Sequence, residues 1–339
     1  MKMCQTGTKT WCIRITLLML LIIFFYCFSY YLQRKTGSIK PPPPSRPMCD
    51  KWRMQNRWES LKFNITRKRK LFFGMEDFFW RQHNSAFGLP YGIKGMEPLL
   101  LKILAGTNSF KMPESIENLE CRTCVVIGNG FGIRNHSLGA IIDEHHVIIR
   151  LNDAPVRGYE QDVGSKTTMR LFYPESAFYN PNLHNDPDTL QVLVPFKQQD
   201  LRWLKEILYN EKRMRKGFWK PPPQIWTATS SQIRVLDPYF LQHTASKLLK
   251  IQLTSRGKQK PIHPTTGILA VFMALNYCDE VHVAGFGYPG DQNVKQPIHY
   301  YGSTTMKSMK NSYHDLSQET EALKRLEDIG AIKFLHHNS

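Results

Sequence analysis

Acidic side chains are scarce in this chain of 339 residues, in which 28 Asp and Glu residues stand against 45 Lys and Arg residues. The formal net charge of +17 indicates a polyanionic partner or an anionic substrate. Charge alone does not separate nucleic acid, a membrane surface and a charged metabolite. The chain has no internal repeats and only one Pro/Ser-rich linker, near its N-terminus. Of its residues, 42 % are hydrophobic, which predicts one substantial core.

Cysteine is scarce as well. Three of the seven cysteines, Cys4, Cys12 and Cys27, lie before or inside an apolar N-terminal segment, which leaves Cys49, Cys121, Cys124 and Cys278. An even set in an oxidising compartment fits two disulfides, with three possible connectivities. A zinc site is the other interpretation, but one C-x-x-C pair with two scattered cysteines matches it poorly.

Charged residues are absent from Ile15 to Gln33, a stretch of nineteen residues that is long enough to cross a bilayer as a helix. The apolar part is longer than a signal-peptide core, and no small-x-small cleavage site follows it. We therefore expect a retained transmembrane signal anchor over residues 15–33, after a cytoplasmic tail of residues 1–14. Basic residues flank both ends, so this charge pattern leaves the orientation open.

The segment "KPPPPSRP", Lys40 to Pro47, forms neither helix nor sheet and predicts a semi-rigid stem, which we place at residues 34–60. Residues 61–339 then form a single catalytic domain. Glycosylation sequons at Asn64 and Asn135 favour a luminal position for this domain.

Short β-branched runs alternate with helical stretches in this domain. The strands are expected at residues 124–130, 146–152, 190–196 and 280–287. One helix is expected at residues 266–278, with Thr265 or Thr266 as N-cap, and another from Asp315 to a stop at Gly330. This alternation predicts an α/β fold of three layers with a mainly parallel sheet. Such sheets bind ligands at the carboxyl ends of their strands, so residues 128–132, Asn152 and residues 285–288 could meet at one crevice.

The run "VVIGNGFG" resembles a dinucleotide-binding turn, but it lacks the third glycine of G-x-G-x-x-G. Ile133 occupies that position, and Gly132 comes one residue early. A nicotinamide site is therefore doubtful, although a glycine turn still lets backbone amides approach a phosphate. A tight turn that binds no ligand is the alternative.

The run "HPTTGIL" places Thr265, Thr266 and Gly267 at a helix start, where free amides and the helix dipole favour an anion. Simple capping of the helix is the alternative.

Two acidic pairs have metal-ligand spacing. Asp186 and Asp188 form a D-x-D of the kind that metal-dependent glycosyltransferases use, but they lie in a Pro/Asn-rich loop, where aspartates serve turn geometry. Glu160 and Asp162 lie in a similarly polar stretch. We expect no metal at either pair.

His299 and His314 lie fifteen residues apart near the C-terminus. A histidine has an unperturbed pKa of about 6.5, which suits an acid–base role in a mildly acidic secretory compartment. His314 directly precedes a helix cap, so its ring could project into a crevice. Two solvent-exposed loop histidines are the alternative.

Taken together, these stretches resemble the eukaryotic sialyltransferase family, which has four sialylmotifs. The matching segments are Cys121–Arg170 (the large motif), His263–Gly287 (the small motif), "HYYG" from His299, and H-x-x-x-x-E from His314 to Glu319. They occur in the family's order and spacing and cover nearly the whole predicted domain. The stretches "LPYGIKG", "GSKTTMRLFYPESA" and "GFWK" resemble the β-galactoside α2,3-sialyltransferases, with type IV and then type VI as the nearest subgroups.

The resemblance implies a single Rossmann-like domain, a sialyltransferase variant of the GT-A fold, in the Golgi membrane with type II topology. It implies inverting transfer from CMP-sialic acid to the 3-hydroxyl of terminal galactose, on Galβ1,4GlcNAc or Galβ1,3-type acceptors of glycoproteins and glycolipids. It implies no metal or other cofactor and no nucleic-acid partner.

The resemblance also assigns individual residues. His314 matches the general base, and His299 matches the residue that hydrogen-bonds the departing phosphate. The matches to donor-binding residues are Asn129, Asn152, Thr265, Thr266 and Gly267. Cys124 and Cys278 match the disulfide between the large and small motifs, which leaves Cys49 to pair with Cys121. His263 departs from the aromatic residue that some members carry before "PTTG".

Two other functions stay open. A luminal nicotinamide-dependent oxidoreductase requires the third glycine of the fingerprint and an acidic ribose ligand, where Asn152 stands instead. A catalytically inactive glycan-binding relative would keep the fold without requiring His314.

Overall fold

The computed structural model of the chain contains two compact units, Met1–Met48 and Cys49–Ser339. The residues that it describes are 6–35, 51–64, 66–67, 70–80, 87–107, 110–180, 186–253, 262–289, 295–309 and 313–336. In the first unit, helix α1 (Thr6–Lys35) covers the predicted segment Ile15–Gln33. Within the described residues, no helix has both the length and the apolar character needed to cross a membrane. The predicted helix is therefore confirmed as a helix, but not as a membrane span.

A seven-stranded sheet forms the centre of the second unit, in the order β5-β4-β3-β2-β1-β6-β7. The strands are β1 (Thr123–Ile127), β2 (Val147–Leu151), β3 (Met169–Phe172), β4 (Leu190–Leu193), β5 (Ile233–Val235), β6 (Glu280–Ala284) and β7 (Lys333–Phe334). Every strand pairing is parallel, which confirms the predicted sheet type. The sequence did not predict β3, β5 and β7, because these strands are short, with four, three and two residues.

Helices and short turns connect the strands. The helices are α2 (Lys51–Ser60), α3 (Glu76–Trp80), α4 (Glu97–Gly106), α5 (Glu114–Glu117), α6 (Gly139–Asp143), α7 (Glu160–Val163), α8 (Gln198–Leu208), α9 (Pro238–His243), α10 (Thr266–Tyr277) and α11 (Leu316–Asp328). The 3-10 turns are η1 (Phe131–Ile133), η2 (Pro174–Ser176) and η6 (Met306–Met309), and η4 (Thr244–Leu248) is π-helical. Thr265 caps α10 and Asp315 caps α11, which confirms both predicted helix starts.

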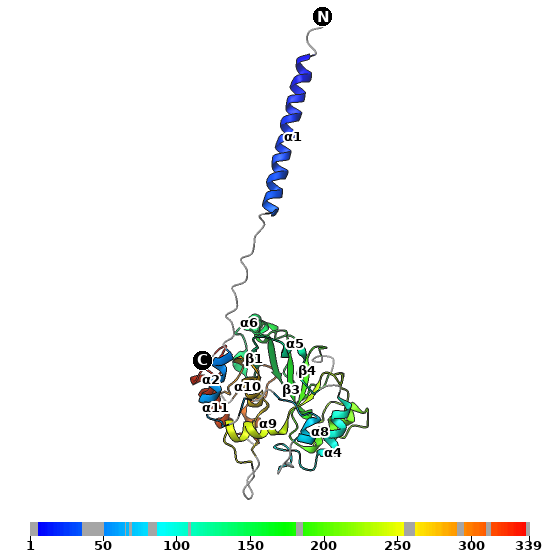
Figure 1. The fold of residues 1–339 in the computed structure, drawn as a ribbon, viewed down its shortest axis with the longest axis vertical. Coiled ribbons are helices and arrows are strands. Elements are labelled where there is room, and N and C mark those ends of the chain that lie inside the picture. Colours follow the sequence, from blue (N-terminus) through cyan, green and yellow to red (C-terminus); the bar gives the residue numbers. More distant parts are fainter. Residues whose placement is uncertain are drawn as a thin grey trace. The chain divides into compact units, whose positions relative to one another are not determined.

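The sheet is covered by helices on both faces, so the predicted three-layer architecture is confirmed (Figure 1). Successive residues of a strand point to opposite faces. In β1, Cys124 and Val126 pack in the cluster that contains α10, whereas Val125 and Ile127 pack in the cluster that contains α6. Helices α4 and α8 cover β3 to β5 on the same face as α6. Because helices cover both faces, a ligand can reach the sheet only at the ends of its strands.

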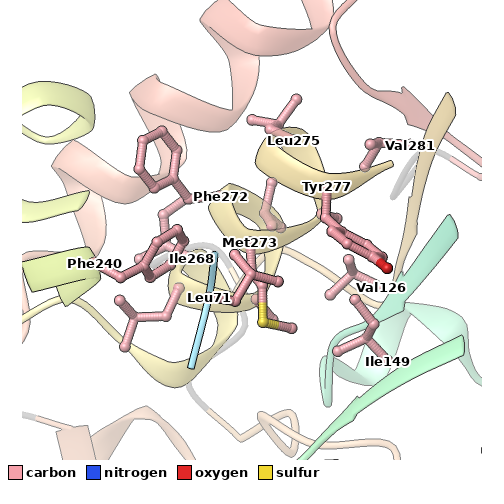
Figure 2. Close-up of a cluster of buried hydrophobic side chains, with 14 of the residues drawn as sticks. Leu71, Val126, Ile149, Phe240, Ile268, Phe272, Met273, Leu275, Tyr277 and Val281 are labelled. Carbon is pink, nitrogen blue, oxygen red and sulfur yellow. The ribbon is translucent and has the colours of Figure 1, made fainter. Parts of the chain in front are cut away.

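Helix α10 is the centre of the largest hydrophobic cluster (Figure 2). Every residue of it except Gly267 is buried. Phe272 packs against Trp58 and Phe240, with ring centroids 5.6 Å and 5.3 Å away. Full burial of such a side chain contributes about 1.5–3 kcal/mol relative to exposure. Burial of α10 on all sides holds its N-terminus in a fixed place at the edge of the sheet.

The compact unit begins earlier than the sequence predicts. Helix α2 falls within residues 34–60, which we assigned to the stem, yet Met54 and Trp58 are buried in the core. Trp58 is surrounded by Phe63 and Phe272. Helix α2 therefore belongs to the folded unit, because it buries side chains that a solvated stem would expose.

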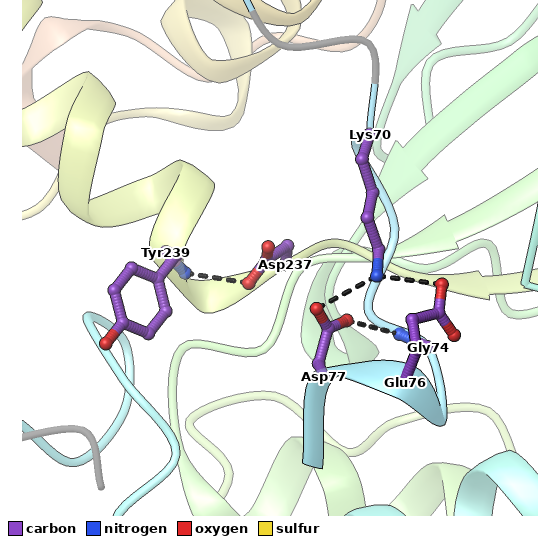
Figure 3. A network of polar contacts seen from close by, with 6 residues as sticks. All are labelled: Lys70, Gly74, Glu76, Asp77, Asp237 and Tyr239. Atoms are coloured by element: carbon purple, nitrogen blue, oxygen red, sulfur yellow. Dashed lines mark hydrogen bonds and ion pairs between the residues drawn. The ribbon is translucent and has the colours of Figure 1, made fainter. Parts of the chain in front are cut away.

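A short segment covers the edge strand β5. The N–H of Phe73 donates to the carbonyl of Val235 at 2.9 Å, and the N–H of Asp237 donates to the carbonyl of Leu71 at 3.0 Å. The residues around this segment form a polar network (Figure 3). Lys70 donates to Glu76 and Asp77, and Asp77 also accepts from the N–H of Gly74. The pairing satisfies backbone groups that an open edge would expose.

The predicted disulfide between Cys124 and Cys278 is present. It joins β1 to the C-terminal end of α10. Cys121 is also disulfide-bonded, and its predicted partner, Cys49, lies outside the described residues. That second pairing stays a prediction.

Candidate functional site

The loops after β1 and β6 meet at the point where the sheet reverses its strand order. Strands β1 to β5 follow one another in one direction, and β6 then pairs with the other edge of β1. Open parallel sheets bind ligands at such a switch point, outside the carboxyl ends of the strands. The N–H of Gly130 donates to the carbonyl of Gly285 at 2.7 Å, so the two predicted glycine loops are in contact.

Glycine is required where these loops touch. A Cβ on Gly128 would lie 2.3 Å from the carbonyl oxygen of Gly285. Gly285 has a φ of +67°, and a Cβ there would lie 2.5 Å from the carbonyl oxygen of Gly128. The turn continues into η1, where Ile133 is buried, and not into an α-helix whose N-terminus could face a pyrophosphate. Contact within the chain therefore explains these glycines without a nicotinamide cofactor.

Asn129 lies between the two glycines of the β1 loop. Its carbonyl accepts from the N–H of Tyr300 at 3.0 Å, and its Nδ2 donates to the hydroxyl of Tyr301 at 3.2 Å. The neighbouring Gly130 forms an antiparallel bridge with His299. The Oδ1 atom of Asn129 is buried and has no hydrogen-bond partner in the structure. A buried acceptor is normally satisfied, so this oxygen is suited to a ligand's N–H or O–H group.

Asn152 follows β2, the strand that pairs with β1. It adopts a left-handed conformation with a φ of 52°, which asparagine tolerates better than most residues. Its N–H donates to the carbonyl of Leu171, and its carbonyl accepts from Nη1 of Arg170, each at 2.8 Å. Its Oδ1 atom is also buried without a partner. Two unpartnered amide oxygens therefore lie at the same edge of the sheet, on neighbouring strands.

His299 lies against the loops of β1 and β2. Its ring stacks on Tyr301 with centroids 5.1 Å apart, and the Tyr301 hydroxyl donates to Asp153 at 3.1 Å. Lys220 lies 3.5 Å from the other carboxylate oxygen of Asp153. Burial lowers the pKa of His299 below its usual 6.5, against the opposing effect of Asp153. The ring is therefore held in place and neutral near pH 7.

The N-terminus of α10 is tied to α11 through Glu319. The N–H of Thr265 donates to Oε1 of Glu319 at 2.6 Å, and the Thr265 hydroxyl donates to Oε2 at 2.5 Å. The same hydroxyl oxygen accepts from the N–H of Ile268, so it caps the helix. Burial raises the pKa of Glu319 to about 7, although both Thr265 bonds oppose that shift. The glutamate of the H-x-x-x-x-E segment thus partners the threonine cap rather than His314.

His314 is held by the chain just before α10. Its Nδ1 lies 2.8 Å from the carbonyl oxygen of His263. A carbonyl can only accept, so Nδ1 carries the proton and the lone pair lies on Nε2. Burial lowers the pKa of His314 below 6.5, more than the bond to His263 raises it. The imidazole is therefore neutral near pH 7, with its basic lone pair on Nε2.

Phe286 lies between the two histidine environments. A Cβ on Gly128 would lie 3.1 Å from its ring, and a Cβ on Gly267 would lie 3.2 Å from the same ring. Two segments therefore pack on the Phe286 side chain. One is the β1 loop, which bonds the His299 segment, and the other is the start of α10, which follows His263. The structure brings all the predicted donor-binding segments to this end of the sheet.

Several residues of the site escaped the sequence analysis. They are Arg170, Asp153, Tyr301 and the carbonyl of His263. Arg170 is fully enclosed and holds the carbonyls of Asn152 and Ala154. Because Arg170 lies inside a strand, the sequence did not indicate that its side chain would hold these carbonyls. Tyr301 was detectable only by its place beside His299 in "HYYG".

The acidic pairs set aside in the sequence serve turns. The carbonyl of Asp186 accepts from the N–H of Thr189 at 3.0 Å, which closes the turn that contains Asp188. The carboxylate of Asp162 accepts from the N–H groups of Asn135 and Ser137. Asn64 and Asn135, the sequon asparagines, are both exposed.

Comparison with known proteins agrees with this geometry. Residues 66–331 match the family described as glycosyltransferase family 29 (sialyltransferase). The chain is 49 % identical over 323 residues to the human CMP-N-acetylneuraminate-beta-galactosamide-alpha-2,3-sialyltransferase 4, covering 94 % of this chain and 96 % of that protein. It is 47 % identical over 241 residues to the Type 2 lactosamine alpha-2,3-sialyltransferase of Rattus norvegicus, covering 71 % of this chain and 72 % of that protein.

The fold is also similar to a solved structure, that of a mammalian sialyltransferase in complex with Gal-beta-1-3GalNAc-ortho-nitrophenol. The TM-score is 0.63 at 23 % identity, over 86 % of this chain and 99 % of that one. The family match spans most of the folded unit, and the two relatives are identical to this chain at nearly half of the aligned positions. The chain therefore belongs to glycosyltransferase family 29, the sialyltransferases.

Proposed function

We propose that this chain is a CMP-N-acetylneuraminate–β-galactoside α2,3-sialyltransferase, which transfers sialic acid from CMP-sialic acid to the 3-hydroxyl of terminal galactose. The observation that carries the mechanism is the tautomer of His314, whose Nδ1 proton bonds the His263 carbonyl and whose lone pair therefore lies on Nε2. The α2,3 linkage rests on the relatives, which are both named for it. The acceptors are Galβ1,4GlcNAc and Galβ1,3-type termini of glycoproteins and glycolipids, as expected for a type IV enzyme.

On the acceptor side, Nε2 of His314 takes the proton of the galactose 3-hydroxyl as its oxygen attacks the anomeric carbon of the sialyl group. The bond from that carbon to the CMP phosphate breaks, and the configuration inverts. A base that is neutral near pH 7 suits this step. The lowered pKa of His314 keeps the base unprotonated in a mildly acidic compartment.

On the donor side, the unpartnered oxygens of Asn129 and Asn152 accept from donor groups of the cytidine. His299 donates to the phosphate as its negative charge develops. The amides at the start of α10, with Thr265, Thr266 and Gly267, supply the positive end of a helix dipole to the same group. Electrostatic stabilisation of the leaving group thus comes from the chain itself.

We propose that the transfer needs no metal. The full chain is incubated with CMP-sialic acid and Galβ1,4GlcNAc in excess EDTA, and the product linkage is determined. Full activity with an α2,3 product is expected. Activity that disappears on chelation and returns with a divalent cation would refute the metal-free mechanism, and an α2,6 product would refute the linkage.

We further propose that the protein is a Golgi type II membrane protein anchored by residues 15–33. The support is the uncharged sequence of this segment and the exposed sequons at Asn64 and Asn135. Resistance to alkaline carbonate extraction, with the folded unit protected from protease in intact vesicles, is the expected result. Extraction into the soluble fraction would refute the anchor.

A catalytically inactive glycan-binding relative is the second candidate. It would share the fold and bind galactosides, but it would show no transfer in the EDTA assay. The committed Nδ1 proton of His314 favours the enzyme, because simple binding requires no particular tautomer.

A further inference from the structure

A pocket lined by basic residues lies at the junction of three elements of the folded unit. Its volume is about 430 Å³, and the end of α2, the η4 turn and the last turns of α11 contribute to its wall. Lys62, Lys247, Lys250 and Arg325 line it, and none of the described lining residues is acidic. None of the four forms any of the ion pairs found between described residues. This concentration of uncompensated positive charge favours an anionic ligand.

Arg325 has a donor that the chain does not use. Its Nη2 donates to the carbonyl of Leu248 at 2.9 Å, which fixes the guanidinium. Its Nε atom is buried and has no hydrogen-bond partner. An oriented guanidinium with an unsatisfied N–H is suited to an oxyanion, because planar donors match carboxylate, sulfate and phosphate oxygens.

Three residues of the pocket have unusual backbone conformations. Lys62, Asn64 and Lys250 adopt left-handed φ values of 52°, 53° and 56°. Lysine is uncommon in this region, since its Cβ meets the backbone there. Backbone strain of this kind gathers at ligand sites, where the surrounding structure holds it in place.

The remaining lining indicates the class of ligand. Ser60, Ser246 and Asn64 offer neutral hydrogen-bonding groups, which fit sugar hydroxyls. Phe63 also lines the pocket, but its ring packs against Trp58 and it is only 6 % exposed, so no aromatic face is free to stack on a nucleobase. We propose that this pocket binds an acidic sugar, whose sulfate or carboxylate lies among the four cations.

The pocket is separate from the transfer site. His314 precedes the first turn of α11, whereas Arg325 lies in its last turn. At a rise of 1.5 Å per residue, the nine residues from Leu316 to Arg325 span roughly 14 Å. The proposal therefore stands whether or not the chain is a transferase, and its test uses binding rather than activity.

The test measures binding of three tetrasaccharides to the full chain in detergent by calorimetry. A heparin tetrasaccharide carries sulfates, an unsulfated chondroitin tetrasaccharide carries only carboxylates, and chitotetraose is uncharged. The pocket variant carries Lys62→Gln, Lys247→Gln and Lys250→Gln. The control variant loses the same charge at exposed sites with Lys94→Gln, Lys102→Gln and Lys212→Gln. All proteins also carry Thr66→Ala, which removes the sequon at Asn64 and leaves the lining of the pocket unchanged.

We expect at least one acidic tetrasaccharide to bind the protein with intact lysines, and its Kd to rise at least tenfold in the pocket variant. The Kd of the control variant should change by less than about threefold, which is the effect of losing three positive charges at sites away from the pocket. Tighter binding of heparin would show that the pocket prefers sulfate. Equal binding of chondroitin would show that the pocket accepts a carboxylate as well as a sulfate. Equal losses in both variants, binding of chitotetraose as tight as that of the acids, or no binding at all would overturn the proposal.

Discussion

His299 and His314 are both partly buried, yet their contacts suit them to different tasks. His299 is held by backbone pairing with Gly130 and by stacking on Tyr301, and no acceptor fixes its tautomer among the bonds described above. His314 has its Nδ1 proton fixed by a carbonyl. A fixed tautomer matters for a base, because the lone pair must point at the proton that it removes.

Replacement of His314 by alanine should therefore abolish transfer but spare the donor site. We expect kcat/KM to fall by at least about 100-fold, the usual contribution of a general base. CMP affinity, measured by calorimetry, should change by less than about twofold. His136→Ala, at an exposed histidine, is the control and should retain full activity. A His314→Ala protein with near-normal turnover would remove the base assignment.

Glu319 is a buried carboxyl that joins two helices through Thr265. Its pKa of about 7 lies above the ordinary 4.5, so the folded chain binds a proton at pH values where the unfolded chain has lost it. The resulting stabilisation is complete below about pH 4.5 and is lost as the pH rises through 7. The folded chain therefore gains stability from this group in a mildly acidic compartment, where Glu319 is protonated, whereas the two Thr265 bonds themselves favour the ionised form.

The variant Glu319→Gln cannot ionise, so its thermal midpoint should depend less on pH between 5 and 8 than that of the parent chain. The midpoint itself should be lower at pH 5, because an amide offers one acceptor oxygen to the two Thr265 donors, at a cost of about 1–3 kcal/mol. Glu321→Gln, at an exposed position on the same helix, should leave the pH dependence unchanged. Parallel pH curves for Glu319→Gln and the parent would contradict the assignment.

Among the elements, the loops after β1 and β6 make the closest backbone contact of the site. Gly128 and Gly285 face each other with no room for a side chain on either. This contact sets the spacing between the strands whose loops carry Asn129 and Phe286. The two loops therefore behave as one rigid unit at the carboxyl end of the sheet.

Gly128→Ala should force these loops apart. The added methyl group would lie 2.3 Å from a backbone oxygen, and overpacking of this kind costs about 1–3 kcal/mol. We expect a lower thermal midpoint together with weaker CMP binding. Gly88→Ala is the control, because its nearest contact would be 3.7 Å away and its φ is not positive. Unchanged CMP binding in Gly128→Ala would show that the donor site does not depend on this contact.

Across the whole folded unit, the Cys124–Cys278 disulfide joins β1 to α10 over a separation of 154 residues. A cross-link over so long a loop restricts the unfolded chain and contributes about 5 kcal/mol in the chain-entropy description. Both ends are buried, so the bond also keeps α10 against the central strand.

The double variant Cys124→Ala/Cys278→Ala should unfold at a markedly lower denaturant concentration, by up to about 5 kcal/mol in free energy of unfolding. Cys27→Ser, which changes the exposed free cysteine of α1, should unfold at the same concentration as the parent. Equal stability of all three proteins would show that packing around α10 is sufficient without the disulfide.

Much of the fold followed from local sequence. The strand runs at β1, β2, β4 and β6 and the caps of α10 and α11 were predictable, because apolar periodicity and capping chemistry act over a few residues. Strands β3, β5 and β7 were not, because runs of four, three and two residues show little periodicity. Arg170 and Arg234 are buried there only because long-range hydrogen bonds to carbonyls satisfy them. The boundary of the folded unit was also misplaced, since Trp58 finds its partners far away in the sequence.

The same division applies to the site. The resemblance to the sialyltransferase motifs proposed His299, His314, Asn129 and Asn152 as site residues, and it predicted the Cys124–Cys278 bond, which is present. Only the folded chain showed that Glu319 bonds Thr265, that a carbonyl of His263 fixes the tautomer of His314, and that basic residues of α11, η4 and the chain after α2 share a pocket. The reason is physical: capping and patterning are properties of neighbouring residues, whereas proton positions and pockets depend on groups that folding alone brings together.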